Sequence, residues 1–312
     1  MATIGKTKLK KMLRRGDRKE YKYFLLFGGV AIVGFILFYL LPIIRTVILS
    51  FTDTEIFSLH SSWVGWDNYL YALTDDYQFW NSIKLSLIFA TASGLCVLVT
   101  SMILALLMNT KVKGIGIFRT IYFIPFIIPS FAVGAVYKNF FNPYNGLVNQ
   151  ILGWIGIADP PLWYIVGETA LLTMILISAM GFGVKMLVFL AALQGIPNSL
   201  YEVAAIEGAT PVQRFMKITL PLISPMLFFN VILITIDGMK AFSLAFVMGN
   251  GQGWPSNSTL LFPIYMFMTA FNTPFKLGYA AAMALLFFLL ILALTGFHFL
   301  MSKYYVEKDV TV

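Results

Sequence analysis

The sequence predicts an all-helical integral membrane protein, a bundle of six transmembrane helices. Of its 312 residues, 59% are hydrophobic and only 12% are charged. The apolar residues form six runs, each close to the roughly 20 residues that a helix needs to cross a bilayer. Most charges fall in the segments between these runs. A soluble domain of this length carries far more charge on its surface, so the composition favours a membrane protein.

The six runs lie at 23–50, 83–108, 117–137, 169–193, 222–248 and 277–300. The third run is the shortest, and Pro125 and Pro129 interrupt it. Proline is tolerated in a spanning helix where neighbouring groups satisfy the freed carbonyls. We therefore divide the chain into a basic N-terminal arm at 1–22, a transmembrane domain at 23–302 and a short tail at 303–312.

The charge of the connecting segments alternates along the chain. The N-terminal arm holds nine of the 22 Lys and Arg residues, and the segment 51–81 holds five carboxylates with neither Lys nor Arg. The turn after the second run is basic again, with Lys111, Lys113 and Arg119. Positive segments stay in the cytoplasm. This alternation predicts that both termini and the segment 194–221 lie in the cytoplasm.

Several other classes of partner and site are disfavoured. The basic arm lies next to an apolar run, which suits anionic lipid headgroups and not nucleic acid. The first run is too long for the core of a secretory signal. The single cysteine, Cys96, lies in an apolar run and is interpreted as a packing residue. His60 and His298 are far apart in the sequence, so no metal site is predicted.

The cytoplasmic segment 194–221 has the pattern of a helix, a turn and a second helix. Pro197 ends the fourth span. Gly208 permits a backbone conformation that a side chain would penalise, which suits a sharp turn. Thr210 followed by Pro211 is a typical helix start. We expect an elbow at the membrane surface, small enough to enter a cleft of another protein.

The same segment resembles the signature of the permease subunits of binding-protein-dependent ABC importers. That signature is E-A-A, three residues, G, nine residues, I, one residue and L-P. Here it reads Glu202-Val203-Ala204, then Gly208, Ile218 and Leu220-Pro221, with departures at Val203, normally Ala, and at Glu207, where Asp is commoner. Further segments resemble the sugar-importing branch, closest to the first permeases of the maltose and glycerol-phosphate type: 50–53, 65–69, 145–149, 249–259 and 278–282.

The resemblance implies a non-catalytic subunit of the bacterial inner membrane that works with a second permease, a cytoplasmic ATPase dimer and an extracytoplasmic solute-binding protein. Its elbow would dock into a groove on the ATPase, and ATP-driven closure would open the path alternately to each side for a sugar. This chain has no G-x-x-x-x-G-K-[ST] run, so ATP and Mg would bind to the partner and no cofactor to this chain. The implied coupling residues are Glu202, Val203, Ala204, Ala205, Glu207, Gly208 and Ala209.

Charges within the apolar runs indicate a second site. A charged side chain at the bilayer centre costs about 2.5–3.5 kcal/mol on insertion scales, so its presence needs a reason. Asp237 and Lys240 are three residues apart on one helix face, and Lys185 lies at a similar depth on the fourth helix. The resemblance places path-lining residues in the same two regions. The candidates are Gly181, Lys185, Asp237, Lys240, Phe242 and Phe246.

Two interpretations of these charges remain open. Asp237 can pair with Lys185 or Lys240 and fix the helix packing. Alternatively, Asp237 lines a water-filled path and accepts hydrogen bonds from sugar hydroxyls, while Phe242 or Phe246 covers the sugar ring. Two lysines against one aspartate leave a positive surplus, which allows for an anionic sugar as well as a neutral one.

Two other function classes fit the sequence less well than an importer subunit. A secondary transporter or channel acting alone would give the elbow at 194–221 no purpose, and the sequence has no evident inverted repeat. A membrane-embedded enzyme needs a constellation of His, Cys or carboxylate groups at depth, which Asp237 alone does not make. The sequence therefore favours the importer subunit.

Overall fold

The computed structural model describes residues 22–23, 26–57, 61–110, 112–272 and 274–305. Apart from Lys22, the arm predicted at 1–22 lies outside these residues, and so do His60 and residues 306–312 of the tail. The described chain is helical almost throughout. Its β structure is limited to two isolated bridges, one of them between Thr52 and Trp63. The all-helical prediction is confirmed.

Four helical stretches of the described chain are long and apolar enough to cross a membrane unaided. They are Leu26–Leu49, Tyr77–Met108, Ser224–Met248 and Leu277–Tyr304. The first stretch consists of the helical residues 26–35, η1 (Ile36–Leu40) and α2 (Leu41–Leu49). The others are α4 (Tyr77–Met108), α13 (Ser224–Met239) with α14 (Ser243–Met248), and α16 (Leu277–Tyr305).

Two further spans are helices broken by a bend. The axes of α5 (Ile115–Ile127) and α6 (Ser130–Phe140) meet at 102°, and those of α8 (Gly167–Ser178) and α9 (Gly183–Gln194) meet at 41°. Pro129 has no N–H to donate and disfavours a helical conformation at Ile128, which is extended, so the first bend falls there. With each bent pair as one span, the described residues give the six spans that the sequence predicts.

α4 is the central helix of the bundle and contacts α8, α9, α13 and α15. Its buried side is made largely of small residues, which let neighbouring helices approach closely: Ser82, Ser86, Ala90, Ser93, Gly94, Ser101 and Ala105. A Cβ on Gly94 would lie 2.7 Å from Ile234 Cγ2, and a Cβ on Gly238 would lie 2.8 Å from the Ala90 Cα. The backbones of α4 and α13 therefore nearly touch where they cross.

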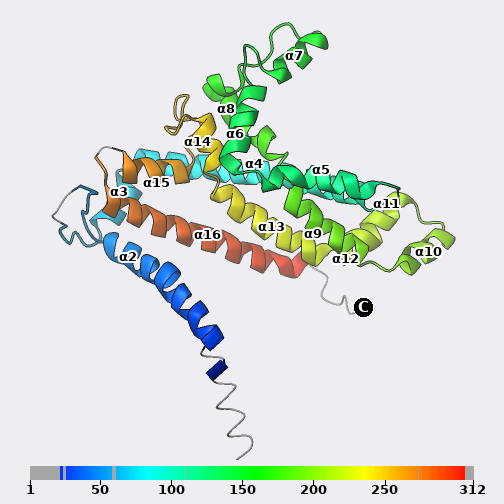
Figure 1. The fold of residues 1–312 in the computed structure, drawn as a ribbon, viewed down its shortest axis with the longest axis horizontal. Helices are drawn as coiled ribbons and strands as arrows, with labels where there is room; N and C mark the ends of the chain where they lie inside the picture. Colours follow the sequence, from blue (N-terminus) through cyan, green and yellow to red (C-terminus); the bar gives the residue numbers. More distant parts are fainter. Residues whose placement is uncertain (1–21, 24–25, 58–60, 111, 273, 306–312) are drawn as a thin grey trace, which may run out of the picture.

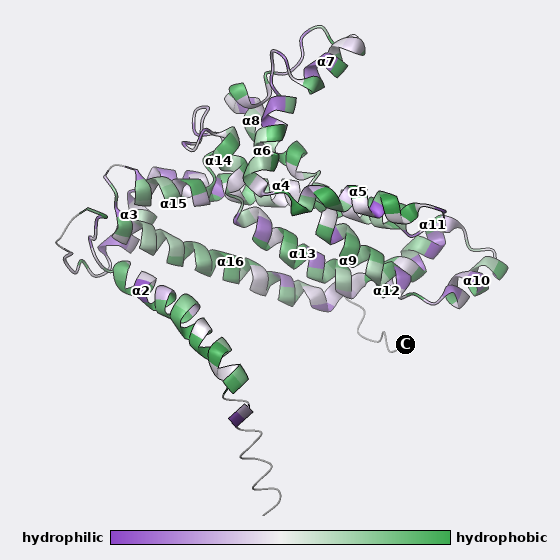
Figure 2. Ribbon diagram, in the orientation of Figure 1, coloured by the Kyte–Doolittle hydropathy of each residue, from purple (hydrophilic) through white to green (hydrophobic). Residues whose placement is uncertain are grey.

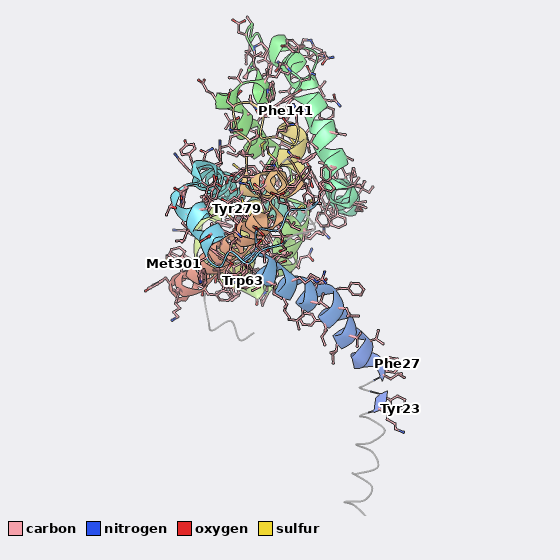
Figure 3. The ribbon with its side chains drawn as sticks, turned by 90° about the vertical axis from the view of Figure 1, so that its left-hand side faces the viewer. Tyr23, Phe27, Trp63, Phe141, Tyr279 and Met301 are labelled. Atoms are coloured by element: carbon pink, nitrogen blue, oxygen red, sulfur yellow. The ribbon has the colours of Figure 1, made fainter. Side chains whose placement is uncertain are left out.

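The N-terminal helix projects away from the bundle (Figure 1). It contacts α16, and Figure 3 shows Tyr23 and Phe27 near its outer end. Its most apolar stretch has no buried residue, although the helix is hydrophobic over most of its length (Figure 2). An apolar helix surface that the protein leaves uncovered must be covered by lipid or by another chain.

A lobe formed by α6, α7 (Leu147–Trp154), α8 and α14 stands off the long axis of the bundle (Figure 1). Lys138 on α6 fastens this lobe. Its Nζ donates to the Val247 carbonyl oxygen at 2.7 Å and to Asn250 Oδ1 at 2.6 Å. It also lies 5.6 Å from the centre of the Tyr164 ring, in the short helix η2 (Trp163–Ile165). One side chain thus holds three segments together.

Three short α-helices of the connecting segments were not predicted: α3 (Asp67–Thr74), α7 and α15. α15 (Phe262–Phe271) lies in the segment that the sequence analysis left as a connection between the fifth and sixth spans. It is too short to cross a bilayer. Its start is held on α4, because the Phe262 N–H donates to Ser86 Oγ at 2.7 Å. Phe262 and Ile264 are fully buried, so α15 belongs to the core of the bundle.

Asp76 ties α15 and α16 to the start of α4. This buried carboxylate caps α4 by accepting from the Phe79 N–H at 3.1 Å. Its other oxygen accepts from the hydroxyl of Tyr265, at 2.6 Å, and from that of Tyr279. The preceding helix, α3 (Asp67–Thr74), leads into this cap. A single carboxylate therefore fixes the meeting point of three helices.

Candidate functional site

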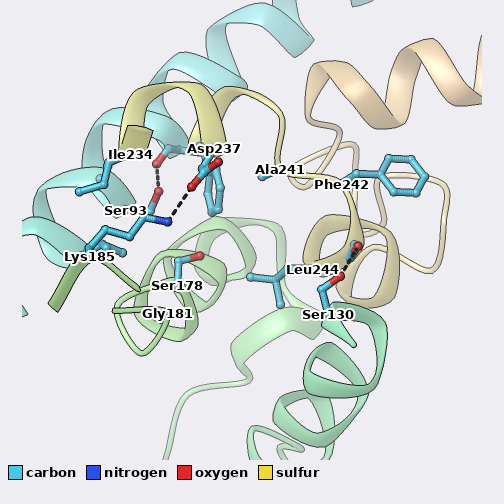
Figure 4. Close-up of a pocket in the computed structure, with 15 residues that line it drawn as sticks. Ser93, Ser130, Ser178, Gly181, Lys185, Ile234, Asp237, Ala241, Phe242 and Leu244 are labelled. Carbon is cyan, nitrogen blue, oxygen red and sulfur yellow. Dashed lines mark hydrogen bonds and ion pairs between the residues drawn. The ribbon is translucent and has the colours of Figure 1, made fainter. Parts of the chain in front are cut away.

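Three helix breaks meet at one pocket, here called the path pocket (Figure 4). They are the breaks between α5 and α6, between α8 and α9, and between α13 and α14. The cavity has a volume of about 310 Å³. Backbone that leaves the helical form at membrane depth is tolerated where it is buried in protein or lines a cavity. Broken spans are also where transporters place their binding sites, so the convergence of three breaks marks this pocket as the candidate site.

An ion pair crosses the path pocket. Lys185 Nζ on α9 lies 2.6 Å from Asp237 Oδ2 on α13 (Figure 4). The Lys185 side chain is 15% exposed and that of Asp237 is 62% exposed. A mostly buried ammonium needs a counterion, so the pair stabilises the packing of α9 on α13. Asp237 still has acceptor capacity on its exposed side, because a carboxylate can accept about four hydrogen bonds.

Four serines add hydroxyl groups to the lining: Ser93, Ser130, Ser178 and Ser243. Ser93 Oγ donates to the Phe89 carbonyl at 2.6 Å, and Ser130 Oγ donates to Ser243 Oγ at 2.9 Å. The oxygen of a hydroxyl that donates inward keeps acceptor lone pairs for a ligand. Apolar groups such as those of Val97 and Phe242 complete the wall. This mixture suits a ligand with hydroxyl groups and apolar ring faces.

The structure brings some of the predicted path residues together and leaves two out. Gly181, Lys185, Asp237 and Phe242 line the path pocket. Among the described residues, Lys240 and Phe246 are not part of the lining. Lys240 is exposed at the end of α13.

Phe246 belongs to an aromatic cluster beside the path pocket. Its ring centre lies 5.4 Å from that of Phe242, 5.8 Å from that of Phe131 and 5.7 Å from that of Phe267. It therefore supports Phe242 from behind.

The serines of the path pocket were missed by the sequence analysis. Ser178 and Ser130 lie next to helix breaks, and Ser93 lies on the small-residue side of α4. For Ser130 the sequence does contain a signal, because Pro129 immediately precedes it and a proline within an apolar run indicates a helix break. Within the described residues, no group of three or more His, Cys, Asp or Glu side chains could hold a metal ion.

The segment 194–221 forms the helix–turn–helix elbow that the sequence predicts. α10 (Asn198–Ile206) ends in a turn at Gly208, whose φ is +77°. The turn closes with a hydrogen bond from the Ala209 N–H to the Ala204 carbonyl at 2.9 Å. Thr210 and Gln213 cap the next helix reciprocally, a capping box.

The second arm of the elbow leads directly into the fifth span. It consists of α11 (Pro211–Arg214), the π-helical turn η3 (Phe215–Thr219) and α12 (Leu220–Leu222). The Tyr201 hydroxyl on α10 lies 2.8 Å from Thr219 Oγ1 on η3, so the two arms are linked. A force on α10 would therefore be transmitted toward α13.

The tip of the elbow exposes an apolar surface. Ile206 is 87% exposed, Val212 is 71% exposed and Val203 is 55% exposed. Of the implied coupling residues, Ala204 is buried, Ala209 is half-buried and the others are exposed: Glu202, Val203, Ala205, Glu207 and Gly208. Ile206 was missed by the sequence analysis because it falls between the signature positions. Exposed apolar side chains with charged neighbours are typical of a protein-binding surface.

A family model described as "Binding-protein-dependent transport system inner membrane component" matches residues 97–304, which are 208 of the 312 residues. The chain belongs to this family. The match contains the elbow and every residue named above as lining the path pocket except Ser93. The chain is thus an integral membrane permease, and its described residues hold four apolar helices long enough to span a membrane, or six spans if each bent pair counts as one.

Curated relatives match nearly the whole permease. "Probable ABC transporter permease protein YesP" from Bacillus subtilis (strain 168) is 37% identical over 296 residues, 95% of each chain. "Lactose transport system permease protein LacF" from Rhizobium radiobacter is 30% identical, over 89% of this chain and 93% of that one. The "sn-glycerol-3-phosphate transport system permease protein UgpA" of Agrobacterium fabrum (strain C58 / ATCC 33970) is 30% identical, over 88% and 91%.

Solved structures share the fold of this permease. A chain of a bacterial ABC transporter involved in the import of the acidic polysaccharide alginate superimposes with a TM-score of 0.74. The match covers 97% of this chain and all of that chain, at 23% sequence identity. A second structure, of a bacterial alginate ABC transporter in complex with an alginate pentasaccharide-bound periplasmic protein, gives a TM-score of 0.76. The all-helical membrane architecture is therefore that of an ABC transporter permease.

Proposed function

We propose that this permease is one half of the pore of an ATP-driven importer that carries a sugar or oligosaccharide, neutral or anionic, across the bacterial inner membrane. The other half is a second permease. The names of the relatives, which include lactose and sn-glycerol-3-phosphate permeases, support this substrate class. ATP and Mg bind to a separate ATPase dimer, because the sequence has no phosphate-binding loop of the G-x-x-x-x-G-K-[ST] type.

The exposed elbow is the observation that carries this proposal. It presents Ile206 and Glu202 on a short helix that stands clear of the bundle (Figure 1). An apolar side chain that is 87% exposed gains free energy when a partner covers it, at about 25 cal/mol per Å² of apolar surface. A channel or transporter working alone would have no use for this surface. We assign the elbow to the groove of the ATPase, on the cytoplasmic side together with both termini.

The path pocket supplies the chemistry for sugar binding. Asp237 accepts hydrogen bonds from sugar hydroxyls on its exposed side, and Phe242 covers an apolar ring face. The ion pair makes Lys185 and Asp237 neutral together, so a neutral sugar fits. An anionic sugar is favoured by Lys240, which lies exposed just beyond the lining, and by the positive end of α6, which starts at the pocket with Ser130.

We base alternating access on α13, because the elbow leads into its start and the path pocket lies at its end. ATP-driven closure of the ATPase dimer would move α10 and, through the link between Tyr201 and Thr219, the start of the fifth span. The other end of α13 carries Asp237, so the movement reaches the ion pair. The uncovered apolar surface of α2 suits the second permease or lipid, and a solute-binding protein would deliver the sugar from outside.

The proposal is tested by purifying the complex from cells that express this permease at its natural level with an affinity tag. An ATPase and a second permease should co-purify in detergent. After reconstitution, ATP hydrolysis should rise when the sugar-loaded binding protein is added. A permease that purifies alone and transports sugar in vesicles without ATP would establish the stand-alone transporter instead. The matched control is a variant in which Glu202 and Ile206 are both replaced by Arg, which should lose the ATPase but keep the second permease.

A further inference from the structure

A second cavity adjoins the path pocket. It lies in the angle between α5 and α6 and has a volume of about 450 Å³. The two cavities share four lining residues: Ser130, Ser178, Gly181 and Leu244. The two cavities are therefore adjacent, and these four residues belong to the wall between them. Cavities of at least about 300 Å³ are of the size that proteins use for small ligands.

The second cavity has a different chemistry from the first. It contains no charged residue, and its lining includes Tyr122, Phe126 and Tyr137. The Tyr122 ring packs against that of Phe182, with 5.8 Å between the ring centres. Within the described residues, the hydroxyls of Tyr122 and Tyr137 have no hydrogen-bond partner. Aromatic faces with free hydroxyls at their edges suit a ligand that is apolar on its faces and polar around its rim.

Contacts within the chain fix the positions of α5, α6 and α9 around this cavity. The extended backbone at Ile128 and Pro129 sets the 102° bend, which keeps α6 from folding back onto α5. α9 approaches α5 closely, since a Cβ on Gly183 would lie 3.4 Å from Phe126 Cβ. α6 is fixed on the other side through Lys138 and its bonds to the 247–250 segment. The cavity is thus a preformed feature of the fold.

We propose that the cavity at Tyr122 and Tyr137 is a second sugar subsite, so that the path holds at least two linked rings. The inference rests on the proposed function. One ring occupies the path pocket at Asp237 and Phe242. The next ring passes the small side chains of Ser130, Ser178 and Gly181 and stacks in the second cavity, where the two tyrosine hydroxyls bond to its hydroxyl groups. The substrate class is therefore an oligosaccharide and not a monosaccharide.

The experiment uses the assembled importer in proteoliposomes with its binding protein and ATP. Uptake is measured for labelled mono-, di- and trisaccharides of one neutral series, the α-1,4-glucosides, and one acidic series, the α-1,4-galacturonides. The variants are Tyr122→Ala, Tyr137→Ala and the conservative Tyr122→Phe. The matched control is Tyr144→Ala, because Tyr144 is 83% exposed beyond the end of α6 and lines neither cavity.

The expected result is a loss that depends on sugar length. Losing a stacked aromatic ring is worth about 0.5–1.5 kcal/mol, so each alanine variant should lower the ratio of trisaccharide to monosaccharide uptake about three- to tenfold. Tyr122→Phe should lower it less, and Tyr144→Ala should not change it. Co-purification of the second permease should stay at the wild-type level.

Three outcomes would overturn the subsite. The alanine variants could leave the length ratio unchanged, or lower the uptake of all lengths equally. They could also release the second permease, which would show that a helix of that subunit fills the cavity. A failure of the proposed function is distinguishable, because the wild-type complex would then move none of the sugars, and the subsite would fall with it.

Discussion

Lys185 on α9 and Asp237 on α13 form an ion pair in which the lysine side chain is mostly buried and the aspartate side chain is exposed. The Nζ–Oδ2 distance is 2.6 Å, yet Lys185 is only 15% exposed while Asp237 is 62% exposed. The lysine thus depends on the aspartate for neutralisation, whereas the aspartate has a free side toward the path pocket. This asymmetry allows one residue to serve both the packing of the helices and the binding of a ligand.

Replacing Asp237 with Ala should lower uptake far more than it lowers expression. The change removes a ligand acceptor and also leaves a mostly buried lysine without its counterion. The double variant Lys185→Met with Asp237→Leu removes both charges, so it should restore expression and thermal stability but not uptake. Uptake and the amount of folded protein in the membrane are measured side by side. Losses of equal size in both would assign Asp237 to packing alone.

Replacing Ile206 with Glu should release the ATPase from the complex. The substitution places a charge where the exposed apolar side chain would be covered, and it should cut co-purified ATPase and sugar-stimulated ATP hydrolysis at least tenfold, a loss of about 1.4 kcal/mol or more in binding. Ile155→Glu is the matched control, because Ile155 is 72% exposed on the lobe, away from the elbow. Wild-type amounts of ATPase on Ile206→Glu would remove the elbow from the coupling interface.

Substitutions at Gly208 should act through the backbone. Its φ of +77° is strained for any residue with a Cβ, while the space around it is open, with nothing within 4 Å of an added Cβ. The left-handed conformation costs about 1–2 kcal/mol for most residues and less for Asn. Coupled ATP hydrolysis should therefore fall in the order Gly, Asn, Ala, Val, with Pro lowest. Insertion into the membrane should not change, and wild-type uptake by Gly208→Pro would contradict the coupling role.

Gly238→Ala should destabilise the bundle because the new methyl group meets the backbone of α4. Its Cβ would lie 2.8 Å from the Ala90 Cα, too close for any side-chain adjustment to relieve. Overpacking of this kind costs about 1–3 kcal/mol. Gly296→Ala on α16 is the control, since its Cβ would have no neighbour within 4 Å. The melting temperature in detergent should drop by several degrees for the first variant only, and equal melting temperatures would refute the close crossing.

Asp76→Ala should lower the melting temperature more than Asp76→Asn does. The alanine variant removes the cap of α4, worth about 1 kcal/mol, and leaves the hydroxyls of Tyr265 and Tyr279 without their acceptor, at about 1–3 kcal/mol. Asparagine keeps one acceptor oxygen for part of this network. Thermal unfolding in detergent measures the difference. Identical midpoints for the two variants would mean that the carboxylate does not fasten α15 and α16 to α4.

Much of the architecture could be predicted because hydropathy is a local property. A spanning helix is predicted by an apolar run of sufficient length. The elbow is predicted by Pro197, Gly208 and the pair Thr210-Pro211, which lie in one short segment. The boundaries needed correction, since the second span begins at Tyr77, six residues before the predicted start. α15 was not predicted because a buried helix of ten residues is shorter than the apolar run of about 20 residues that indicates a transmembrane helix.

The candidate site could be predicted only in part. Asp237 and Lys185 attracted notice because a charge at membrane depth is costly. By the same criterion Lys240 was as strong a candidate as Lys185. The structure leaves Lys240 outside the path pocket because α13 ends at Met239 and the chain turns there. Ser93, Ser130 and Ser178 carry no such signal, since a serine in a span is cheap and common. Only their position in the wall of the path pocket gives them a role.

The sequence by itself determined the class, the six spans and the elbow, because each depends on residues that are close along the chain. The tertiary structure decided which lysine pairs with Asp237, a partner 52 residues away, and how three broken spans enclose one pocket with a second cavity beside it. Apolar periodicity specifies that a helix is buried in lipid or protein, but not against which neighbour it lies. That choice is made by packing at points such as Gly94 and Gly238, where the shapes of two distant segments must match.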